Sequence, residues 1–421
     1  MNYINISKCR ICKNTDLIEV LNLGNQALSG VFPKSKNIKI TSGPLDLIKC
    51  NNETNPNYCG LLQLKQSYNI EEMYGDNYGY RSGLNPTMVK HLEHITRKAL
   101  KYVTLHPDDM IIDIGSNDAT LLKSYPFDNK VSYIGIDPTS NKFSKYYPNY
   151  IHRISNFFEK DLIINKFNTR KAKIITSIAM LYDLEAPLKF MQDVYEILDD
   201  EGIWYFEQSY MPKMIEMNAY DTICHEHLEY YGLNQINWMA KQIGFKILSL
   251  EFNNTNGGSF AVIAAKNNSK HKINAQEKET INKYLNKESE FSLMHPYIKF
   301  NQEVNKHKND LIILINNILN QNKKIIGLGA STKGNILLQF CELDNSKIEY
   351  IAEVNEDKFG SYTPGTNIPI ISEQEIEPIN PDYMIVLPWH FRDFLIKKQN
   401  KYIESGGKLI FPLPKLEVVS K

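Results

Sequence analysis

Short apolar runs that alternate with helical patterns constrain the fold of this chain more than any other feature. In the middle of the chain, runs such as DMIIDIG and VSYIGID predict strands, and LKFMQDVYEIL has the apolar spacing of a helix. A second alternation begins at KKIIGLGAS and continues through IEYIAEV and DYMIVLP. Alternating strands and helices favour an α/β fold with a doubly wound, mostly parallel sheet. We therefore expect two α/β domains.

Composition changes along the chain divide it further. The 421 residues exceed what one ordinary core holds. Residues 1–70 are rich in Asn, Gly, Pro and Cys and predict a small β-rich module. The polar stretch from residue 266 to about residue 285 predicts a boundary. We expect an N-terminal module at 1–70, a central domain at 71–268 and a C-terminal domain at 269–421.

The charge balance disfavours two classes of partner. Lys and Arg number 48, as do Asp and Glu, so nothing favours nucleic acid or an anionic membrane surface. The start of the sequence lacks the apolar run of a signal peptide, and no stretch approaches the roughly 20 apolar residues that span a bilayer. We expect a cytoplasmic protein.

Four of the six cysteines lie in the first 60 residues, namely Cys9, Cys12, Cys50 and Cys59. In a reducing compartment, clustered cysteines are more often metal ligands than disulfides. Two pairs on separate knuckles suit tetrahedral Zn²⁺, although the second pair encloses the longer segment NNETNPNY. Four thiolates would leave no open position on the metal, so the sequence predicts a structural zinc.

A cofactor site is expected at the end of the strand IIDIG. Asp113 and Asn117 are polar groups beside the turn at Gly115, at the edge of an open α/β sheet where ligands bind. Asp137 ends the next strand, where an acidic residue can bind the hydroxyls of a ribose. That spacing suits NAD or S-adenosylmethionine (SAM). The turn is polar instead of Gly-rich, which favours SAM, because SAM has no phosphate to approach closely.

Residues 220–231 (YDTICHEHLEYY) hold two His, two Glu, one Asp, one Cys and three Tyr. His225, Glu226 and His227 are adjacent, so they cannot all point the same way in a helix or strand. Near-neutral His side chains suit general base catalysis. A purely structural pair of hydrogen-bonded histidines is the alternative.

The C-terminal alternation opens with IIGLGASTKGN. A glycine turn at Gly329 followed by Ser331 and Lys333 at a helix start can hold a phosphate. Together with Glu353 at a later strand end, this pattern also permits a second dinucleotide site, as in a dehydrogenase.

Several long motifs in one order resemble a known family. They are the N-terminal Cys-x-x-Cys, CGLLQL, DIGSNDATLL, YDTICHEHLEYY, NGGSF, IGLGASTKGN, YTPGT and VLPWH. Together they resemble the zinc-containing, SAM-dependent sugar C-methyltransferases of bacterial deoxysugar pathways, which act on nucleotide-linked sugars. The chain differs from the usual motifs at Ala119, at Cys224 before the His-Glu-His unit, and at AMLYDLE, where that family has a histidine.

The resemblance implies a zinc-binding domain, a central class I SAM domain and a C-terminal Rossmann-like domain that holds the nucleotide diphosphate of the sugar. It implies that Gly115, Asn117 and Asp137 line the SAM site, with Phe158 over the adenine.

For catalysis, the resemblance implies His227 as the base, oriented by Glu226. A Tyr-rich motif that matches NYGYRSG places Tyr78 or Tyr80 at the sugar. Cys224, Gly329, Ser331 and Lys333 would contact the substrate. We expect a monomer whose reaction is carbon methylation, with sugar O-methylation or non-catalytic binding of nucleotide sugars as alternatives.

Overall fold

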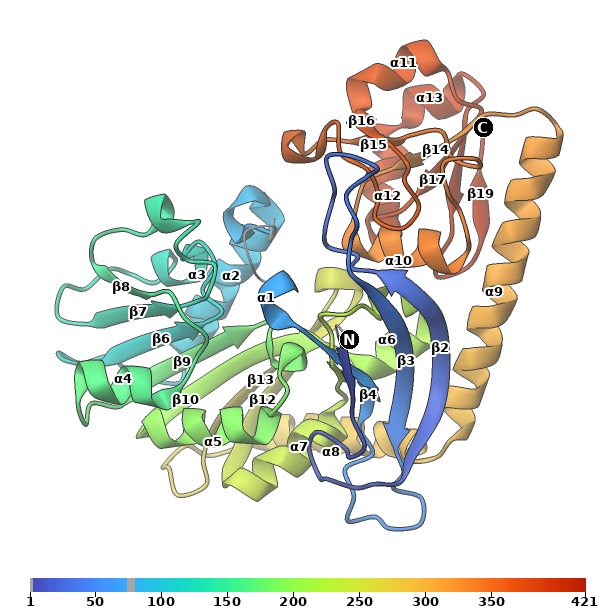
Figure 1. The fold of residues 1–421 in the computed structure, drawn as a ribbon. Helices are drawn as coiled ribbons and strands as arrows, with labels where there is room; N and C mark the ends of the chain where they lie inside the picture. Colours follow the sequence, from blue (N-terminus) through green and yellow to red (C-terminus); the bar gives the residue numbers. More distant parts are fainter. Residues whose placement is uncertain (1–2, 74–79) are drawn as a thin grey trace.

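The computed structural model describes residues 3–73 and 80–421, which fold into three parts (Figure 1). A β-rich N-terminal module lies against both a central α/β domain and a C-terminal α/β domain. Within the described residues, no helix is long and apolar enough to cross a membrane.

The central domain is built on a seven-stranded sheet of order β12-β13-β10-β9-β6-β7-β8. Its strands are β6 (Met110–Ile114), β7 (Ser132–Ile136), β8 (Ile151–Ile154), β9 (Ala172–Ile178), β10 (Leu198–Ser209), β12 (Phe245–Asn253) and β13 (Ser259–Lys266). Strands β6 to β10 pair in parallel, whereas β13 pairs antiparallel with both of its neighbours. The predicted doubly wound α/β fold is confirmed.

Helices cover both faces of this sheet, which explains why β6 is apolar except at Asp113 near its carboxyl end. Ile111 packs with residues of α2 (Pro86–Ala99) and α3 (Thr120–Lys123) on one face. Ile112 and Ile114 pack on the other face with α4 (Lys160–Phe167), α5 (Pro187–Ile197) and α7 (Leu233–Ile243). A strand buried on both faces reads as a continuous hydrophobic run instead of an alternating one.

The N-terminal module is completed by a strand from the central domain. Its four-stranded antiparallel sheet has the order β11-β4-β3-β2, and β1 (Tyr3–Asn5) pairs with β5 (Gln66–Tyr68) beside it. The other strands are β2 (Leu17–Ala27), β3 (Ser42–Cys50), β4 (Leu62–Leu64) and β11 (Glu229–Tyr230), and the short α1 (Ile70–Met73) follows. Because β11 begins two residues after His227, the module's sheet includes residues outside the 1–70 range that the composition suggests.

The C-terminal domain is a second doubly wound unit. Its sheet has the order β16-β15-β14-β17-β18-β19, parallel except for the edge strand β19. The strands are β14 (Ile325–Leu328), β15 (Ile351–Glu353), β16 (Ile370–Ser372), β17 (Tyr383–Val386), β18 (Lys408–Phe411) and β19 (Glu417–Val419). The helices are α10 (Thr332–Phe340), α11 (Ile376–Ile379), α12 (Arg392–Lys398) and α13 (Asn400–Glu404).

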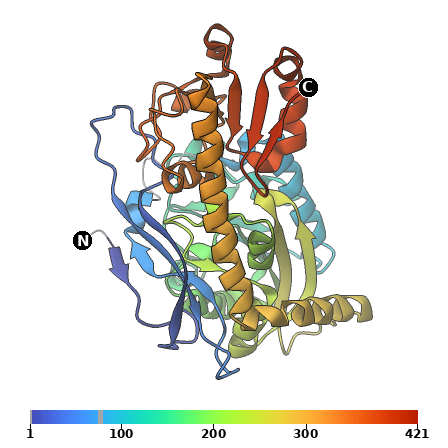
Figure 2. The same ribbon diagram turned by 90° about the vertical axis from the view of Figure 1, so that its right-hand side faces the viewer.

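Helices connect the central domain to the C-terminal domain. The polar stretch expected as a boundary contains α8 (Ala275–Lys287), whose sequence is polar because only Ile281 on it is buried. The long helix α9 (His295–Asn320) then runs along β2 to the C-terminal domain (Figure 2). Asn301 on α9 donates a hydrogen bond to the Val20 carbonyl, 2.7 Å away. This helix is not among the elements predicted from the sequence, although buried residues recur at helical spacing along α9.

Candidate functional site

The four N-terminal cysteines form one compact cluster. Their Sγ atoms all lie within 4.8 Å of one another. The Cys9–Cys59 and Cys12–Cys50 pairs are separated by 3.5 Å, and Cys12 and Cys59 by 3.4 Å. A disulfide needs about 2.05 Å, whereas thiolates about 2.3 Å from one zinc lie just under ~4 Å apart in a tetrahedron. The donor set therefore fits a closed, structural zinc site.

The long segment between Cys50 and Cys59 is held by the central domain. On α7, the Gln235 side chain donates to the Cys59 carbonyl (3.1 Å), and the Trp238 indole donates to the Asn57 carbonyl (3.0 Å). Within the cluster, hydrogen bonds from the Cys50 and Cys59 thiols lower the pKa of Cys12. Hydrogen bonds with Cys12 and Cys50 instead raise the pKa of Cys9, and burial raises that of Cys59. A thiolate is the form that binds a metal.

The cofactor loop (residues 115–118) follows β6 at the carboxyl edge of the central sheet. Gly115 has φ +79° and Asn117 has φ +49°, so the loop turns sharply after the strand. The Asn117 amide donates to Asp137 Oδ2 at 2.9 Å, which joins the two predicted cofactor residues. Asp113 is buried and accepts a hydrogen bond from Thr176 Oγ1 at 2.6 Å. Burial raises the pKa of Asp113 to about 7.

Residues 80–83, which precede α2, form hydrogen bonds with the cofactor loop. The Ser82 amide donates to Asn117 Oδ1 (2.9 Å), and the Gly83 amide donates to Asp118 Oδ2 (3.1 Å). Asn117 Nδ2 donates to the Tyr80 carbonyl (3.1 Å). Tyr80 is 49% exposed and contacts the cofactor loop through its backbone carbonyl. Tyr78, the other candidate of the Tyr-rich motif, lies outside the described residues.

Two further side chains border this region. Met180 lies over Gly115, because a Cβ placed on that glycine would be 3.3 Å from Met180 Cγ. Phe158 is half-buried, and its ring meets Phe190 of α5 edge to face at a centroid distance of 5.3 Å. Part of the Phe158 ring therefore belongs to the core, and its contact with an adenine stays a prediction.

The two histidines of the His-Glu-His turn (residues 222–227) point to different parts of the molecule. His225 is fully buried against the N-terminal module, where Nε2 lies 3.1 Å from the Gln26 carbonyl and the ring meets Tyr68 edge to face at 4.6 Å. Burial lowers the pKa of His225 to about 4. This packing favours a structural role for His225, although the sequence analysis includes it among the catalytic candidates.

His227 is only half-buried and is held from two sides. Its Nδ1 lies 2.8 Å from the Thr222 carbonyl, and its ring meets Tyr182 edge to face at 4.6 Å. A carbonyl oxygen only accepts, so Nδ1 carries the proton and Nε2 keeps its lone pair in the neutral ring. Burial, assisted by the nearby charge of Lys333, lowers the pKa of His227 to about 4.

Glu226 and Cys224 lie on the same turn. Glu226 is half-buried, and burial raises the pKa of its carboxyl group. The Cys224 thiol is buried beside it, and burial and the Glu226 charge raise the pKa of that thiol. A Cβ on Gly30 of the N-terminal module would be 3.0 Å from Glu226 Oε1 and 3.9 Å from Thr332 Oγ1. All three parts of the molecule therefore meet at this turn, and no sequence motif singles out Gly30.

The C-terminal domain brings α10 to the same place. Ser331 caps this helix by accepting a hydrogen bond from the Gly334 amide (3.0 Å). Gly329 has φ +83°, and a Cβ there would be 2.7 Å from Pro388, so the loops after β14 and β17 touch. Lys333 lies near the NGGSF motif, with Nζ 3.7 Å from a Cβ placed on Gly257. The predicted substrate residues of this domain thus adjoin the His-Glu-His turn.

One further contact, which the sequence analysis does not identify, joins these domains. The Trp389 indole of η9 (Trp389–Phe391) donates to Asp221 Oδ2 of η4 (Tyr220–Thr222) at 2.7 Å. Both residues are buried. The contact fixes the start of the His-Glu-His turn to the loop that follows β17.

Glu353, the possible ribose ligand of a second dinucleotide site, accepts hydrogen bonds from the backbone. Both Glu353 oxygens accept backbone amides, from Ala330 at 2.7 Å and from Val354 at 2.7 Å. Lys358 donates to the Ala330 carbonyl at 2.7 Å and lies over the Phe32 ring of the N-terminal module. Through these contacts, Glu353 and Lys358 join the end of β15 to the loop after β14 and to the N-terminal module.

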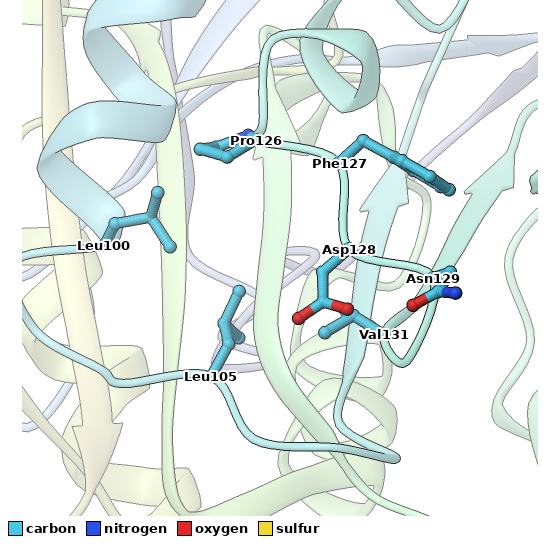
Figure 3. A pocket seen from close by; sticks show the side chains of 7 residues that line it. All are labelled: Leu100, Leu105, Pro126, Phe127, Asp128, Asn129 and Val131. Carbon is cyan, nitrogen blue, oxygen red and sulfur yellow. The ribbon is translucent and has the colours of Figure 1, made fainter.

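A surface hollow of about 450 Å³ lies away from all these groups (Figure 3). It is lined by Leu100, Leu105, Pro126, Phe127, Asp128, Asn129 and Val131. Val131 immediately precedes β7, so the hollow adjoins the amino edge of the sheet, opposite the cofactor loop. It is not part of the candidate site.

Three family models match successive parts of the chain. "Putative zinc binding domain" matches residues 9–74, "Methyltransferase domain" matches residues 88–250, and "C-methyltransferase C-terminal domain" matches residues 254–414. The C-methyltransferase NovU of Streptomyces niveus is 23% identical over 419 residues, which cover 99% of this chain and 97% of that protein.

Solved structures resemble part of the chain. An S-adenosylmethionine-dependent methyltransferase from Clostridium acetobutylicum is 13% identical, with a TM-score of 0.32 over 42% of this chain and 92% of that one. The complex of LepI with SAM is 15% identical, with a TM-score of 0.33 over 44% of this chain and 53% of that one.

Proposed function

We propose that the acceptor of this SAM-dependent methyltransferase is a ring carbon next to a keto group of a nucleotide-linked sugar. Models of a zinc-binding domain, a methyltransferase domain and a C-methyltransferase C-terminal domain match successive parts of the chain, and the C-methyltransferase NovU is similar over almost its full length. The observation that supports this proposal most is the meeting of three groups at one place. They are the free Nε2 lone pair of His227, the charge of Lys333, and the start of α10.

The start of α10 and Lys333 suit the diphosphate of such a substrate. Helix N-termini and lysines bind phosphate groups through backbone amides and charge. The sugar would then extend from the C-terminal domain toward the His-Glu-His turn and the cofactor loop. Gly329 and Ser331 would shape the diphosphate end, and Cys224 with Glu226 would border the sugar.

A carbon becomes a nucleophile only after it loses a proton to a base. His227 Nε2 would take the proton from the carbon next to the ketone, and the C–H electron pair would form an enolate. Bound SAM supplies the electrophilic methyl group. The enolate carbon would accept that methyl group with cleavage of the methyl–sulfur bond, which would restore the ketone and leave S-adenosylhomocysteine.

Substrate binding would tune this base. A pKa of about 4 keeps His227 neutral at pH 7, partly because Lys333 is nearby. A diphosphate beside Lys333 would offset that charge and raise the pKa of His227 toward neutrality, where general base catalysis is most efficient. Within this scheme, Asp137 would bind the ribose of SAM, and Asp113, Gly115 and Asn117 would line its amino acid end.

The decisive experiment offers paired 4-keto and 4-hydroxy nucleotide sugars together with SAM. We expect a mass increase of one methyl group with the keto sugar alone. We also expect exchange of the adjacent proton with deuterated solvent before transfer. Methylation of the 4-hydroxy sugar without exchange would indicate an O-methyltransferase, and binding of both sugars without any product would indicate a non-catalytic binding protein.

A further inference from the structure

Arg10 lies between two zinc ligands, Cys9 and Cys12, and is almost fully buried at 4% exposure. Its backbone amide donates to Gln63 Oε1 at 3.0 Å. The guanidinium donates to the carbonyls of Leu64 and Gln66 and to Ser67 Oγ in the N-terminal module. A metal held by the flanking cysteines would therefore fix the place from which this guanidinium reaches outward.

The same guanidinium contacts the two segments that hold the His227 ring. Its Nε lies 3.3 Å from Glu185 Oε2 and 3.7 Å from Glu229 Oε1. Glu229 is the first residue of β11, two positions after His227. Glu185 follows η3 (Leu181–Asp183), which carries the Tyr182 ring that meets His227 edge to face.

Backbone hydrogen bonds join these segments to each other. The Leu228 amide donates to the Tyr182 carbonyl at 2.8 Å, and the Leu64 amide donates to the Leu228 carbonyl at 2.8 Å. A displacement of either segment would therefore move the His227 ring relative to Lys333.

Of the groups that contact Arg10, Glu229 depends on it the most. Its side chain is completely buried, and within the described part of the chain its carboxyl group faces the Leu184 backbone and Arg10. Burial, together with the nearby charges of Glu185 and Asp183, raises the pKa of Glu229, and the charge of Arg10 opposes that shift. Without Arg10, Glu229 would lose the side chain that its Oε1 faces at 3.7 Å, and its buried carboxyl group would shift further toward the neutral form.

We propose that Arg10 is a positioning residue for methyl transfer. Through Glu185 and Glu229, it transmits the geometry of the zinc knuckle to the imidazole of His227. This inference rests on the proposed role of His227 as base. A purely structural Arg10 would instead stabilise the fold without any specific effect on His227.

The test compares Arg10→Gln and Arg10→Lys with Arg97→Gln, whose arginine is exposed on α2. We expect Arg10→Gln to keep one zinc per chain and S-adenosylhomocysteine affinity within about twofold, while kcat falls about 10- to 100-fold at little-changed KM. Arg10→Lys should recover part of kcat, because lysine restores the charge but not the planar fork. Arg97→Gln should match the wild type.

The decisive measurement is a double-mutant cycle with His227→Asn. If Arg10 acts through His227, Arg10→Gln should change the residual turnover of His227→Asn by less than about twofold. Additive losses, or an Arg10→Gln enzyme with wild-type kcat, would overturn the proposal. If Arg10→Gln fails to fold, Glu185→Gln removes one of the two ion pairs of Arg10 by changing a half-exposed residue. It should lower kcat about threefold with the same non-additivity.

A readout that does not need turnover separates this proposal from the proposed function. NMR titration of the His227 ring should show its pKa moving from about 4 toward the unperturbed value in Arg10→Gln, because the ring leaves its site. If no sugar is methylated but this shift occurs, the sugar assignment fails and the positioning role stands. An unchanged His227 titration would refute the positioning role whatever the substrate.

Discussion

The cofactor loop and the His-Glu-His turn differ in where their contacts come from. The cofactor loop is held by Asp137, Tyr147, Ser82 and Gly83, all within the central domain. The turn is held by Tyr68 and Gln26 of the N-terminal module and adjoins Trp389 and α10 of the C-terminal domain. A site built within one domain tolerates changes elsewhere in the chain, whereas a site shared by three parts should respond to a change in any of them.

Loss of zinc should affect the His-Glu-His turn far more than the cofactor loop, and this is the largest effect expected. Cys12→Ala removes a ligand from the module whose sheet includes β11, and small zinc modules depend on the metal to fold. We expect turnover below about 1% of wild type, with S-adenosylhomocysteine affinity within about threefold. Calorimetry, zinc analysis and turnover measure these effects. Cys341→Ala, a buried cysteine outside the cluster, is the control, and an active zinc-free enzyme would contradict the prediction.

Within the turn, the two histidines should differ sharply. His227→Asn can still donate to the Thr222 carbonyl but lacks Nε2, so we expect turnover to fall about 10²-fold or more at unchanged S-adenosylhomocysteine affinity. His225→Gln can still donate to the Gln26 carbonyl and should cost less than about threefold in turnover. Steady-state kinetics compares them. Equal losses in both variants would mean that the turn acts as a structural unit.

The cofactor loop should respond through affinity instead of turnover. Asp137→Ala removes the carboxylate that accepts the Asn117 amide and is positioned for a ribose. Hydrogen bonds to charged groups contribute about 1.5–3 kcal/mol, so S-adenosylhomocysteine affinity should fall about 10- to 100-fold. Calorimetry measures this, with Asp128→Asn at the remote hollow as control. Wild-type affinity in Asp137→Ala would remove Asp137 from the site.

Stability should depend on pH with opposite sign at the two regions. His225 is protonated near pH 6.5 in the unfolded chain but only near pH 4 in the folded chain. The free energy of unfolding therefore decreases as pH falls from about 6.5 to about 4. Asp113 keeps its proton up to about pH 7 when folded, so its contribution is lost as pH rises from about 4 to 7. Urea unfolding across pH should show the first dependence flattened in His225→Gln and the second in Asp113→Asn. Unchanged slopes would contradict the pKa shifts.

The smallest effect is expected at Ala119. It has φ +62°, a left-handed conformation that costs an alanine about 1–2 kcal/mol. Ala119→Gly relieves this cost but gains about 0.4–1 kcal/mol of unfolded-state entropy, so we expect a net stabilisation of up to about 1 kcal/mol. Ala99→Gly, at the end of helix α2, should instead destabilise by about 1 kcal/mol. Thermal unfolding distinguishes the two, and a destabilised Ala119→Gly would show that the strain is absent.

Local sequence patterns predict many of the strands of this molecule and its cysteine cluster. The strands that carry Asp113 and Asp137 follow from buried apolar runs, because a strand covered on both faces needs no polar alternation. The four cysteines could be grouped from their spacing and compartment, because zinc imposes few other requirements on sequence. The helix α9 was missed, since its buried residues are spread over a long, partly polar segment.

The sequence by itself determined the types of chemistry present: thiolates for zinc, a polar loop for SAM, and a cluster of titratable groups with two histidines. Only the tertiary structure decided which histidine packs against the N-terminal module, because the turn between η4 and β11 places His225 on Tyr68 and leaves His227 beside Tyr182. It also decided that Arg10 reaches Glu185 and Glu229. Those contacts join residues about 175 or more positions apart, and such distant pairing arises from the packing of whole domains, which no local pattern encodes.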